Sequence, residues 1–160
     1  MLYFDYVNKN KNNILLGALS GIALLLLDIA SKLWVTYPSY KPIVFIKDFL
    51  YLTFPQHNSG VAFGIPLPMW MQLVASILVL AVLGAIAKRY IFSAGKPEFI
   101  KSVLFGIIIG GAIGNLIGRV TQGYVVDFIA LRPIPTFNIA DIGITIGLIG
   151  LFITSLQKQN

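Results

Sequence analysis

The sequence of 160 residues contains no cysteine and one histidine, His57. The absence of cysteine excludes disulfide bonds, a thiol nucleophile and a thiolate metal site, and one histidine cannot supply a multi-histidine metal site. Charge is also scarce, because 11% of the residues are charged where a soluble domain carries about a quarter. Since 57% of the residues are hydrophobic, the composition indicates an integral membrane protein whose membrane-spanning part is helical.

Four apolar segments are candidates to cross a bilayer as helices, which takes about 20 residues each. We predict one integral membrane domain over residues 1–160, all-α in the membrane, with transmembrane helices at about 14–35, 69–87, 102–118 and 139–156. The first segment resembles the apolar part of a secretory signal. However, Asp28 and Lys32 interrupt it where a cleavage pattern would stand, so we expect an uncleaved first helix.

The segment between the first two spans, residues 36–67, contains four prolines, which exclude a long helix. Residues 43–54 are rich in Val, Ile, Phe and Tyr, a composition that favours one or two short strands. We therefore expect a small β-rich loop subdomain that lies on the membrane face.

The distribution of Lys and Arg predicts the orientation. With a cytoplasmic N-terminus, seven basic residues fall on the cytoplasmic side: Lys9, Lys11, Lys88, Arg89, Lys96, Lys101 and Lys158. Four fall on the opposite side: Lys41, Lys47, Arg119 and Arg132. The positive-inside rule favours cytoplasmic N- and C-termini, which leaves the loop subdomain at the outer face. We interpret the basic residues as topology signals and expect no nucleic-acid partner.

Glycine recurs at every fourth residue of the third span, from Gly106 to Gly118, and again at Gly143 and Gly147 in the fourth. Small residues at this spacing let helix backbones approach closely in lipid. The pattern therefore predicts close packing of these helices.

Two carboxylates, Asp127 and Asp141, lie fourteen residues apart, at one end of the last two apolar segments. Pro133 and Pro135 between them prevent a continuous helix, so the chain turns back and can bring the carboxylates together at the mouth of a helix bundle. Two neighbouring carboxylates share one proton, and the pair can activate water against a carbonyl group as in aspartic proteases. The alternative is that the acids are only solvated and that Asp141 stabilises a helix N-terminus.

Asp28 and Lys32 are four residues apart on one face of the first helix and can form an ion pair, which is either structural or organises a site. A serine–lysine protease that uses Ser31 and Lys32 is disfavoured, because adjacent residues of a helix point about 100° apart.

Asn58 belongs to the segment His57–Gly64, where its amide either holds a substrate backbone or only makes a turn with the glycines. Asn115 and Arg119 share a face at the outer end of the third span. Arg119 is either an interfacial anchor or holds a carboxylate or a lipid headgroup.

Five blocks in order along the chain resemble the lipoprotein signal peptidases (signal peptidase II): Asp28-x-x-Ser31-Lys32, Asn58-Ser59-Gly60-Val61-Ala62-Phe63, GGAIGNLIGR at 110–119, VVDF and FNIAD. The resemblance implies a four-helix aspartyl endopeptidase of the bacterial inner membrane. Such enzymes remove signal peptides from diacylglyceryl-modified prolipoproteins and cut before the lipidated cysteine. The resemblance implies that Asp127 and Asp141 are the catalytic pair. The substrate-binding or site-organising positions are then Asp28, Lys32, Asn58, Gly60, Asn115, Arg119 and Asn138.

We accordingly expect a monomer without metal or cofactor, whose partners are prolipoprotein substrates and membrane lipids and which globomycin-type inhibitors block. One rival hypothesis is an inactive relative that binds lipopeptides without cleavage. Another is a small proton-coupled transporter, although transporters more often show paired inverted repeats, which are not evident in this sequence.

One position departs from the family pattern. Where the family usually has Gly-Asn-x-x-Asp-Arg, this sequence has Gly118 in place of the aspartate. Either Arg119 lacks a carboxylate partner and activity is reduced, or the outer end of the third helix has repacked along its glycines. The first hypothesis predicts that Gly118→Asp raises turnover, measured as prolipoprotein cleavage by the purified protein. An unchanged or lower rate contradicts it.

Overall fold

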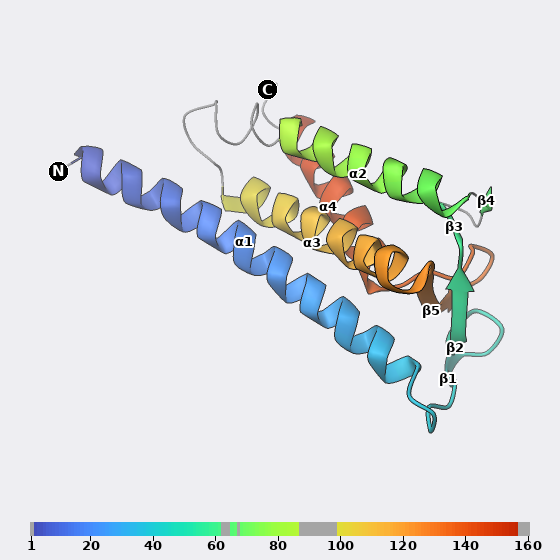
Figure 1. Cartoon of the computed structure of the whole chain (residues 1–160). Helices are drawn as coiled ribbons and strands as arrows, with labels where there is room; N and C mark the ends of the chain where they lie inside the picture. Colours follow the sequence, from blue (N-terminus) through green and yellow to red (C-terminus); the bar gives the residue numbers. More distant parts are fainter. Residues whose placement is uncertain (1, 62–64, 67, 87–98, 157–160) are drawn as a thin grey trace.

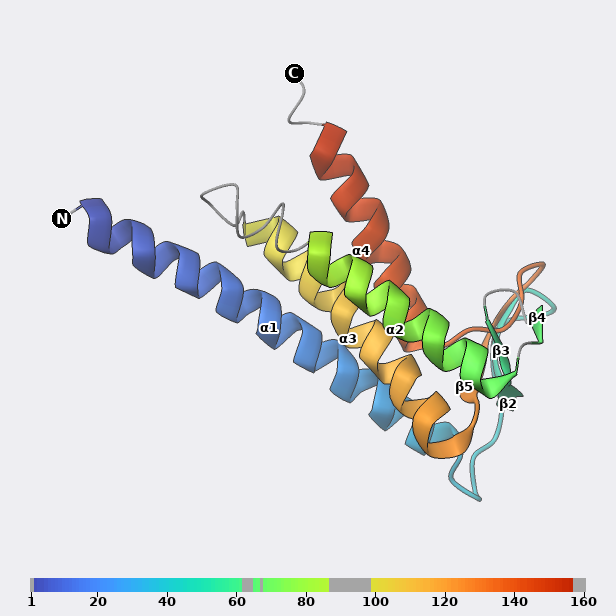
Figure 2. The ribbon, with the colours of Figure 1, turned by 45° about the horizontal axis from the view of Figure 1, so that its top comes forward.

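The structure, a computed structural model, describes residues 2–61, 65–66, 68–86 and 99–156. The elements in chain order are α1 (Leu2–Val35), β1 (Ile43–Ile46), β2 (Leu50–Asn58), β3 (Gly60–Val61), β4 (Ile65–Pro66), α2 (Met69–Ile86), α3 (Phe99–Gln122), β5 (Val125–Leu131) and α4 (Ile139–Leu156). The helices lie side by side, and the strands gather at one end of them (Figure 1). The start of α1 and the end of α4 lie at the opposite end, as the turned view also shows (Figure 2).

Three helices of the described chain are long and apolar enough to cross a membrane, over Lys11–Val35, Phe99–Gln122 and Ile139–Leu156. Helix α2 is equally apolar in character but shorter, over Met69–Ala85. Large apolar side chains on the helix surfaces are exposed, as helices surrounded by lipid require; examples are Leu26, Val79 and Phe152. The first, third and fourth predicted spans are therefore confirmed as helices of membrane-spanning length.

The ends of these helices differ from the prediction. Helix α1 begins at Leu2, twelve residues before the predicted start of the first span at Ile14, and α3 continues past Gly118 to Gln122. The predicted end of the second span, at Ala87, and the basic turn at 88–96 lie outside the described residues. Polar residues that continue a helix beyond the bilayer carry no hydropathy signal, so hydropathy alone misses these extensions.

Helix α3 contacts the other three helices, and three of its glycines, Gly106, Gly110 and Gly114, face α1. A Cβ added at Gly21 would lie 2.6 Å from the carbonyl oxygen of Gly106, and a Cβ at Gly110 would meet the carbonyl oxygen of Gly21. The two backbones are thus in direct contact, and the predicted glycine packing is confirmed. Gly17 and Gly21 of α1 were not singled out, although their own four-residue spacing carried the same signal.

The sheet has the order β1-β2-β5, with both pairings antiparallel. The strands predicted within residues 43–54 are confirmed, and β2 continues to Asn58 past Pro55, where the register with β5 shifts. Proline has no N–H to donate, so a shift in the ladder accommodates it. Strand β5 comes from outside the predicted loop subdomain and is the part of the sheet that was not expected.

Strand β5 is buried along nearly its whole length. Its residues Val126, Phe128 and Ile129 pack with Val35, the last residue of α1, in the hydrophobic core cluster at this end of the helices. Because both faces of the strand are covered, any polar side chain on it is removed from bulk water. This burial determines the environment of Asp127.

The glycine contact between α1 and α3 predicts an effect on stability. A Cβ at Gly106 would collide with the carbonyl oxygen of Gly17, so Gly106→Ala must push the helices apart. We expect it to destabilise the fold by about 1–3 kcal/mol, more than the gain from the higher helix propensity of alanine. Thermal unfolding of the purified protein in detergent measures this change.

Gly84→Ala in α2 is the matched control, because nothing lies within 4 Å of a Cβ there. It should leave the unfolding temperature unchanged or slightly raised. A Gly106→Ala variant as stable as the wild type would contradict the close approach of α1 and α3.

Candidate active site

The side chain of Asn138 caps the N-terminus of α4. Its Oδ1 accepts a hydrogen bond from the N–H of Asp141 at 3.1 Å, and Oδ2 of Asp141 accepts one from the N–H of Asn138 at 3.2 Å. This reciprocal arrangement is a capping box, which satisfies N–H groups that the first turn of a helix leaves without partners. The carboxylate of Asp141 is therefore held at a helix N-terminus, as one of the two alternatives from the sequence predicted.

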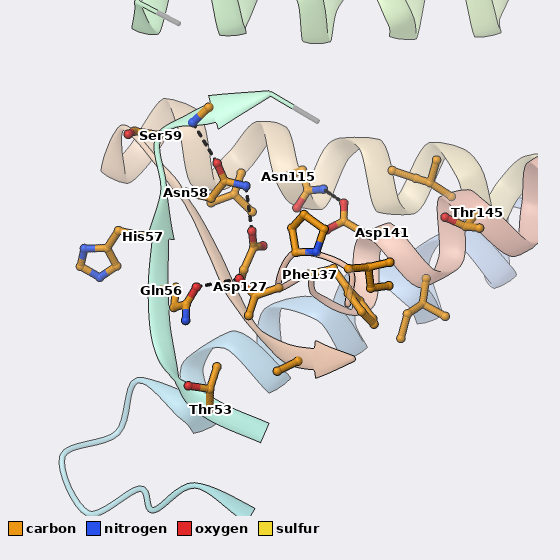
Figure 3. Close-up of a pocket in the computed structure, with 18 of the residues that line it drawn as sticks. Thr53, Gln56, His57, Asn58, Ser59, Asn115, Asp127, Phe137, Asp141 and Thr145 are labelled. Atoms are coloured by element: carbon orange, nitrogen blue, oxygen red, sulfur yellow. Dashed lines mark hydrogen bonds between the residues drawn. The ribbon is translucent and has the colours of Figure 1, made fainter. Parts of the chain in front are cut away.

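Asn138 also connects the two predicted catalytic carboxylates. Its Nδ2 donates to Oδ1 of Asp127 at 2.6 Å, while Nδ2 of Asn115 donates to Oδ1 of Asp141 at 2.8 Å. Because Asn138 contacts both acids, Asp127 and Asp141 face the same space (Figure 3). The expectation that both acids lie at the ends of helices is wrong for Asp127, which strand β5 carries.

Asn58 holds the other oxygen of Asp127. Its Nδ2 donates to Oδ2 of Asp127 at 2.8 Å, and its Oδ1 accepts the N–H of Gly60 at 2.9 Å, which orients the amide. Burial raises the pKa of Asp127 to about 6, although the hydrogen bonds from Asn58 and Asn138 oppose that rise. Asp127 therefore changes its protonation state close to neutral pH, which suits a group that exchanges protons with a substrate.

The predicted ion pair in the first helix is confirmed, with Lys32 Nζ 2.7 Å from Oδ2 of Asp28. Lys32 Nζ also donates to Oδ1 of Asn115 at 3.0 Å, and Oδ1 of Asp28 accepts the N–H of Ala140 at 3.0 Å. A Cβ at Gly114 would lie 2.5 Å from Oδ2 of Asp28, so this glycine makes room for the buried carboxylate. The pair thus joins α1 to α3 and to the start of α4.

A cavity of about 970 Å³ lies between β2, the end of α3 and the first turns of α4 (Figure 3). Six of the predicted site residues line it: Asn58, Gly60, Asn115, Arg119, Asp127 and Asp141. The other three do not line the cavity but bond to its surroundings. Lys32 donates to Asn115 and Asn138 donates to Asp127, both of which line the cavity, and Asp28 accepts the N–H of Ala140 at the start of α4. The structure therefore brings all nine predicted residues into one connected region.

Arg119 reaches into this cavity from α3. Its Nη2 donates to the carbonyl oxygen of Gly60 at 3.4 Å and its Nη1 to that of Asn115 at 3.5 Å, both long hydrogen bonds. Its Nε is buried and has no hydrogen-bond partner among the described residues. In that part of the chain Arg119 also makes no ion pair, which agrees with the hypothesis that it lacks a carboxylate partner.

Gly118 lies against the chain that leads from α3 into β5. A Cβ at this position would be 3.0 Å from the carbonyl oxygen of Tyr124, tighter than ordinary van der Waals contact. This geometry favours the second hypothesis from the sequence, that the outer end of α3 is packed closely where the family usually has an aspartate.

Gln56 and Thr136 are among the polar residues of the cavity that were not predicted as site residues. Thr136 Oγ1 donates to Oε1 of Gln56 at 2.7 Å, and both residues line the cavity beside Asp127. They are 80 residues apart in the sequence, so no local motif connects them. The signal that could have found Gln56 is strand alternation, which places it on the same face of β2 as Asn58.

In the part of the chain that the structure describes, no three His, Cys, Asp or Glu side chains are grouped so that they could hold a metal ion. The acidic groups of the cavity are the two bridged carboxylates. The fold and the site together define a membrane protein of apolar helices with a paired-carboxylate cavity at one end.

Comparison with known proteins identifies the family. Residues 21–157 match the family described as signal peptidase (SPase) II. The chain is 37% identical to the lipoprotein signal peptidase of Syntrophomonas wolfei over 140 residues, which are 86% of this chain and 90% of that relative. It is 34% identical to the lipoprotein signal peptidase of Xylella fastidiosa over 152 residues, 90% of each chain.

Two solved structures of bacterial membrane enzymes share the fold. One has a TM-score of 0.78 at 27% identity and covers 90% of this chain and 89% of its own. The other has a TM-score of 0.72 at 29% identity, with 88% and 92% covered. The chain belongs to the signal peptidase II family, a family of aspartic peptidases, and the resemblance drawn from its five sequence blocks is confirmed.

The hydrogen bond from Asn58 predicts a change in pH dependence. It favours the ionised form of Asp127, so Asn58→Ala should raise the pKa of this carboxyl further above its ordinary value. In a coupled pair the measured pKa values belong to both acids together. When the pKa of one carboxyl is raised, each limb of the rate profile either stays in place or moves to higher pH. We therefore expect the limbs of the kcat/KM profile to move to higher pH. A limb that moves to lower pH would contradict this role of Asn58.

Proposed function

We propose that this protein is an aspartic endopeptidase that removes signal peptides from diacylglyceryl-modified prolipoproteins and cuts before the lipidated cysteine. The observation that carries the proposal is the bridge through Asn138, which holds Asp127 and Asp141 at one cavity next to apolar helices. Membership of the signal peptidase II family supports it, as do relatives that are lipoprotein signal peptidases. Neither the binding-only relative nor the proton-coupled transporter is favoured by these comparisons.

Asp127 and Asp141 share one proton and hold a water molecule between them. The ionised carboxylate takes a proton from the water as its oxygen attacks the scissile carbonyl carbon, and the protonated carboxyl donates to the carbonyl oxygen. The tetrahedral intermediate then collapses: one of its hydroxyl groups returns a proton to the pair as the C–N bond breaks. The leaving amine, which becomes the amino group of the lipidated cysteine, takes a proton from the pair. The chemistry uses two carboxylates and water, so it requires no metal or cofactor.

The other cavity groups orient the substrate and the acids. Asn58, Asn115 and Asn138 hold the carboxylates, and Arg119, which lines the cavity beside Gly60, orients the substrate. Asp28 and Lys32 do not line the cavity but organise the site through hydrogen bonds: Asp28 fixes the start of α4, and Lys32 fixes the side chain of Asn115. The extended segment of the substrate occupies the cavity, and its acyl chains lie against the lipid-facing helix surface.

The chain forms one domain over residues 1–160 with four transmembrane helices, α2 being the additional span, and with the loop subdomain 36–67 at the outer face. Met69–Ala85 measures roughly 26 Å at 1.5 Å per residue, close to the thickness of the hydrocarbon core of a bilayer. The start of α1 and the end of α4 both lie away from the sheet, toward the other end of the helices, which supports N- and C-termini on the same side of the membrane (Figures 1 and 2). The site then faces outward from a bacterial cytoplasmic (inner) membrane, as the excess of basic residues on the other side predicts.

The partners follow from this placement. They are diacylglyceryl-modified prolipoproteins and the surrounding membrane lipids, and the enzyme acts as a monomer whose site is built from residues of one chain. Globomycin-type inhibitors block the enzyme, as the resemblance to the family implies.

The first test is cleavage of a diacylglyceryl-modified prolipoprotein by the purified protein in detergent, followed by gel mobility and mass. We expect Asp127→Asn and Asp141→Asn each to lower the rate by about 10²–10⁴-fold, because each removes one member of the proton-sharing pair. The mass of the product should place the new N-terminus at the lipidated cysteine.

Asp48→Asn is the matched control, since Asp48 is exposed, lies outside the cavity and has a φ of 59° that asparagine also adopts readily. It should cleave as fast as the wild type. No cleavage by a folded wild type would refute the proposed peptidase, and full activity in either variant of the pair would refute the assignment of the dyad.

A further inference from the structure

The end of the ladder between β2 and β5 carries two cross-strand contacts on opposite faces. The register places Asn58 opposite Val125, the first residue of β5. Because side chains alternate along a strand, Asn58 and Asp127 share one face of the ladder, while His57, which is also among the cavity-lining residues, shares the other face with Tyr124. Both pairs are diagonal neighbours, which long and aromatic side chains can bridge. Figure 3 shows His57 on the side of β2 that faces away from Asp127.

The second of these contacts is an aromatic stack. The ring centroids of His57 and Tyr124 are 3.9 Å apart and the ring planes are inclined by 17°. Asn58, the next residue, is the last of β2, and the ends of strands open more readily than their middles. The stack therefore closes the end of the ladder at the point from which the amide of Asn58 reaches Asp127.

The end of helix α3 packs against the backbone of Tyr124. Gly123 has a φ of +82° and its N–H donates to the carbonyl oxygen of Arg119 at 3.1 Å, so the chain reverses directly after the helix. The reversed chain passes over Gly118, where an added Cβ would lie 3.0 Å from the carbonyl oxygen of Tyr124 and 3.7 Å from Cα of Val125. Tyr124 thus rests on the bare backbone of Gly118.

We infer that Tyr124 and His57, supported by Gly118, are positioning residues that act through Asn58 on the carboxylate of Asp127. The inference rests on the proposed function, in which Asp127 belongs to the catalytic pair. It deepens that function because it assigns a role to the position at which the sequence departs from its family. An aspartate at residue 118 would bring its Cβ to 3.0 Å from the carbonyl oxygen of Tyr124, so at this position close packing takes the place of the aspartate. Gly118→Asp should therefore lower turnover, which reverses the expectation from the sequence.

The test compares Tyr124→Leu, which removes the ring and keeps apolar volume, with Tyr124→Phe, which keeps the ring. We expect Tyr124→Leu to lower kcat/KM by about two- to tenfold, the range of one aromatic contact, and to move the rate profile to higher pH in the direction of Asn58→Ala. Tyr124→Phe should retain the pH profile of the wild type. Tyr37→Leu, which removes an exposed tyrosine outside the cavity, is the matched control and should change neither quantity.

A double-variant cycle separates positioning from a general loss of stability. If Tyr124 acts through Asn58, then Tyr124→Leu has no further effect on kcat/KM in a protein that already carries Asn58→Ala. An equal loss in both backgrounds would overturn the inference. So would a Tyr124→Leu variant whose activity falls while its pH profile stays that of the wild type.

A readout that does not depend on activity completes the test. Protein labelled with ¹³C at the aspartate carboxyls is titrated by NMR, and the signal of Asp127 is assigned by its absence from Asp127→Asn. We expect Tyr124→Leu to raise the pKa of Asp127. If that pKa rises but the wild type cleaves no prolipoprotein, the positioning role stands and the proposed function fails. If the wild type cleaves and the pKa does not move, the positioning role alone is refuted.

Discussion

The N-terminus of α4 lies inside the protein and must find partners for its unpaired N–H groups, and the site is built from the residues that meet this requirement. Asn138 accepts the N–H of Asp141, and Asp28 accepts the N–H of Ala140. Neither acceptor is used only as a cap, because Asn138 also donates to Asp127 and Asp28 pairs with a lysine. Capping of the helix and pairing of the carboxylates are therefore parts of one buried hydrogen-bond network.

Close helix packing makes this network possible. Asp28 is fully buried, which is tolerable only because each of its oxygens has a partner. Gly114 leaves the space that its carboxylate occupies, and the direct contact of Gly21 with Gly106 holds α1 against α3 along the same line. The second carboxylate comes from the sheet and not from a helix, since β5 places Asp127 within hydrogen-bond distance of Asn138 at the start of α4. The glycines and the sheet together set the positions of the two acids.

Much of this arrangement was predictable from local patterns. Apolar length indicated the spans, β-branched and aromatic residues indicated the strands at 43–54, and the prolines between Asp127 and Asp141 indicated a chain reversal. Strand β5 was missed because VVDFIAL is an apolar run whose strand character appears only on pairing with β2, about 70 residues earlier. A helix start at residue 139 and a role for Asp141 at a helix N-terminus were predicted, but the reciprocal hydrogen bonds of the capping box with Asn138 were not.

The sequence by itself determined that the protein is a membrane protein, that its helices pack through glycine, and that it belongs to the signal peptidase II family. These properties follow from residue type and short-range spacing, which do not depend on the rest of the fold. Only the tertiary structure decided that Asn138 joins the two acids, that burial brings the pKa of Asp127 to about 6, and that Gly118 supports Tyr124. Burial and hydrogen bonding between these side chains depend on how segments far apart in the sequence come together, and no local pattern of residues specifies that.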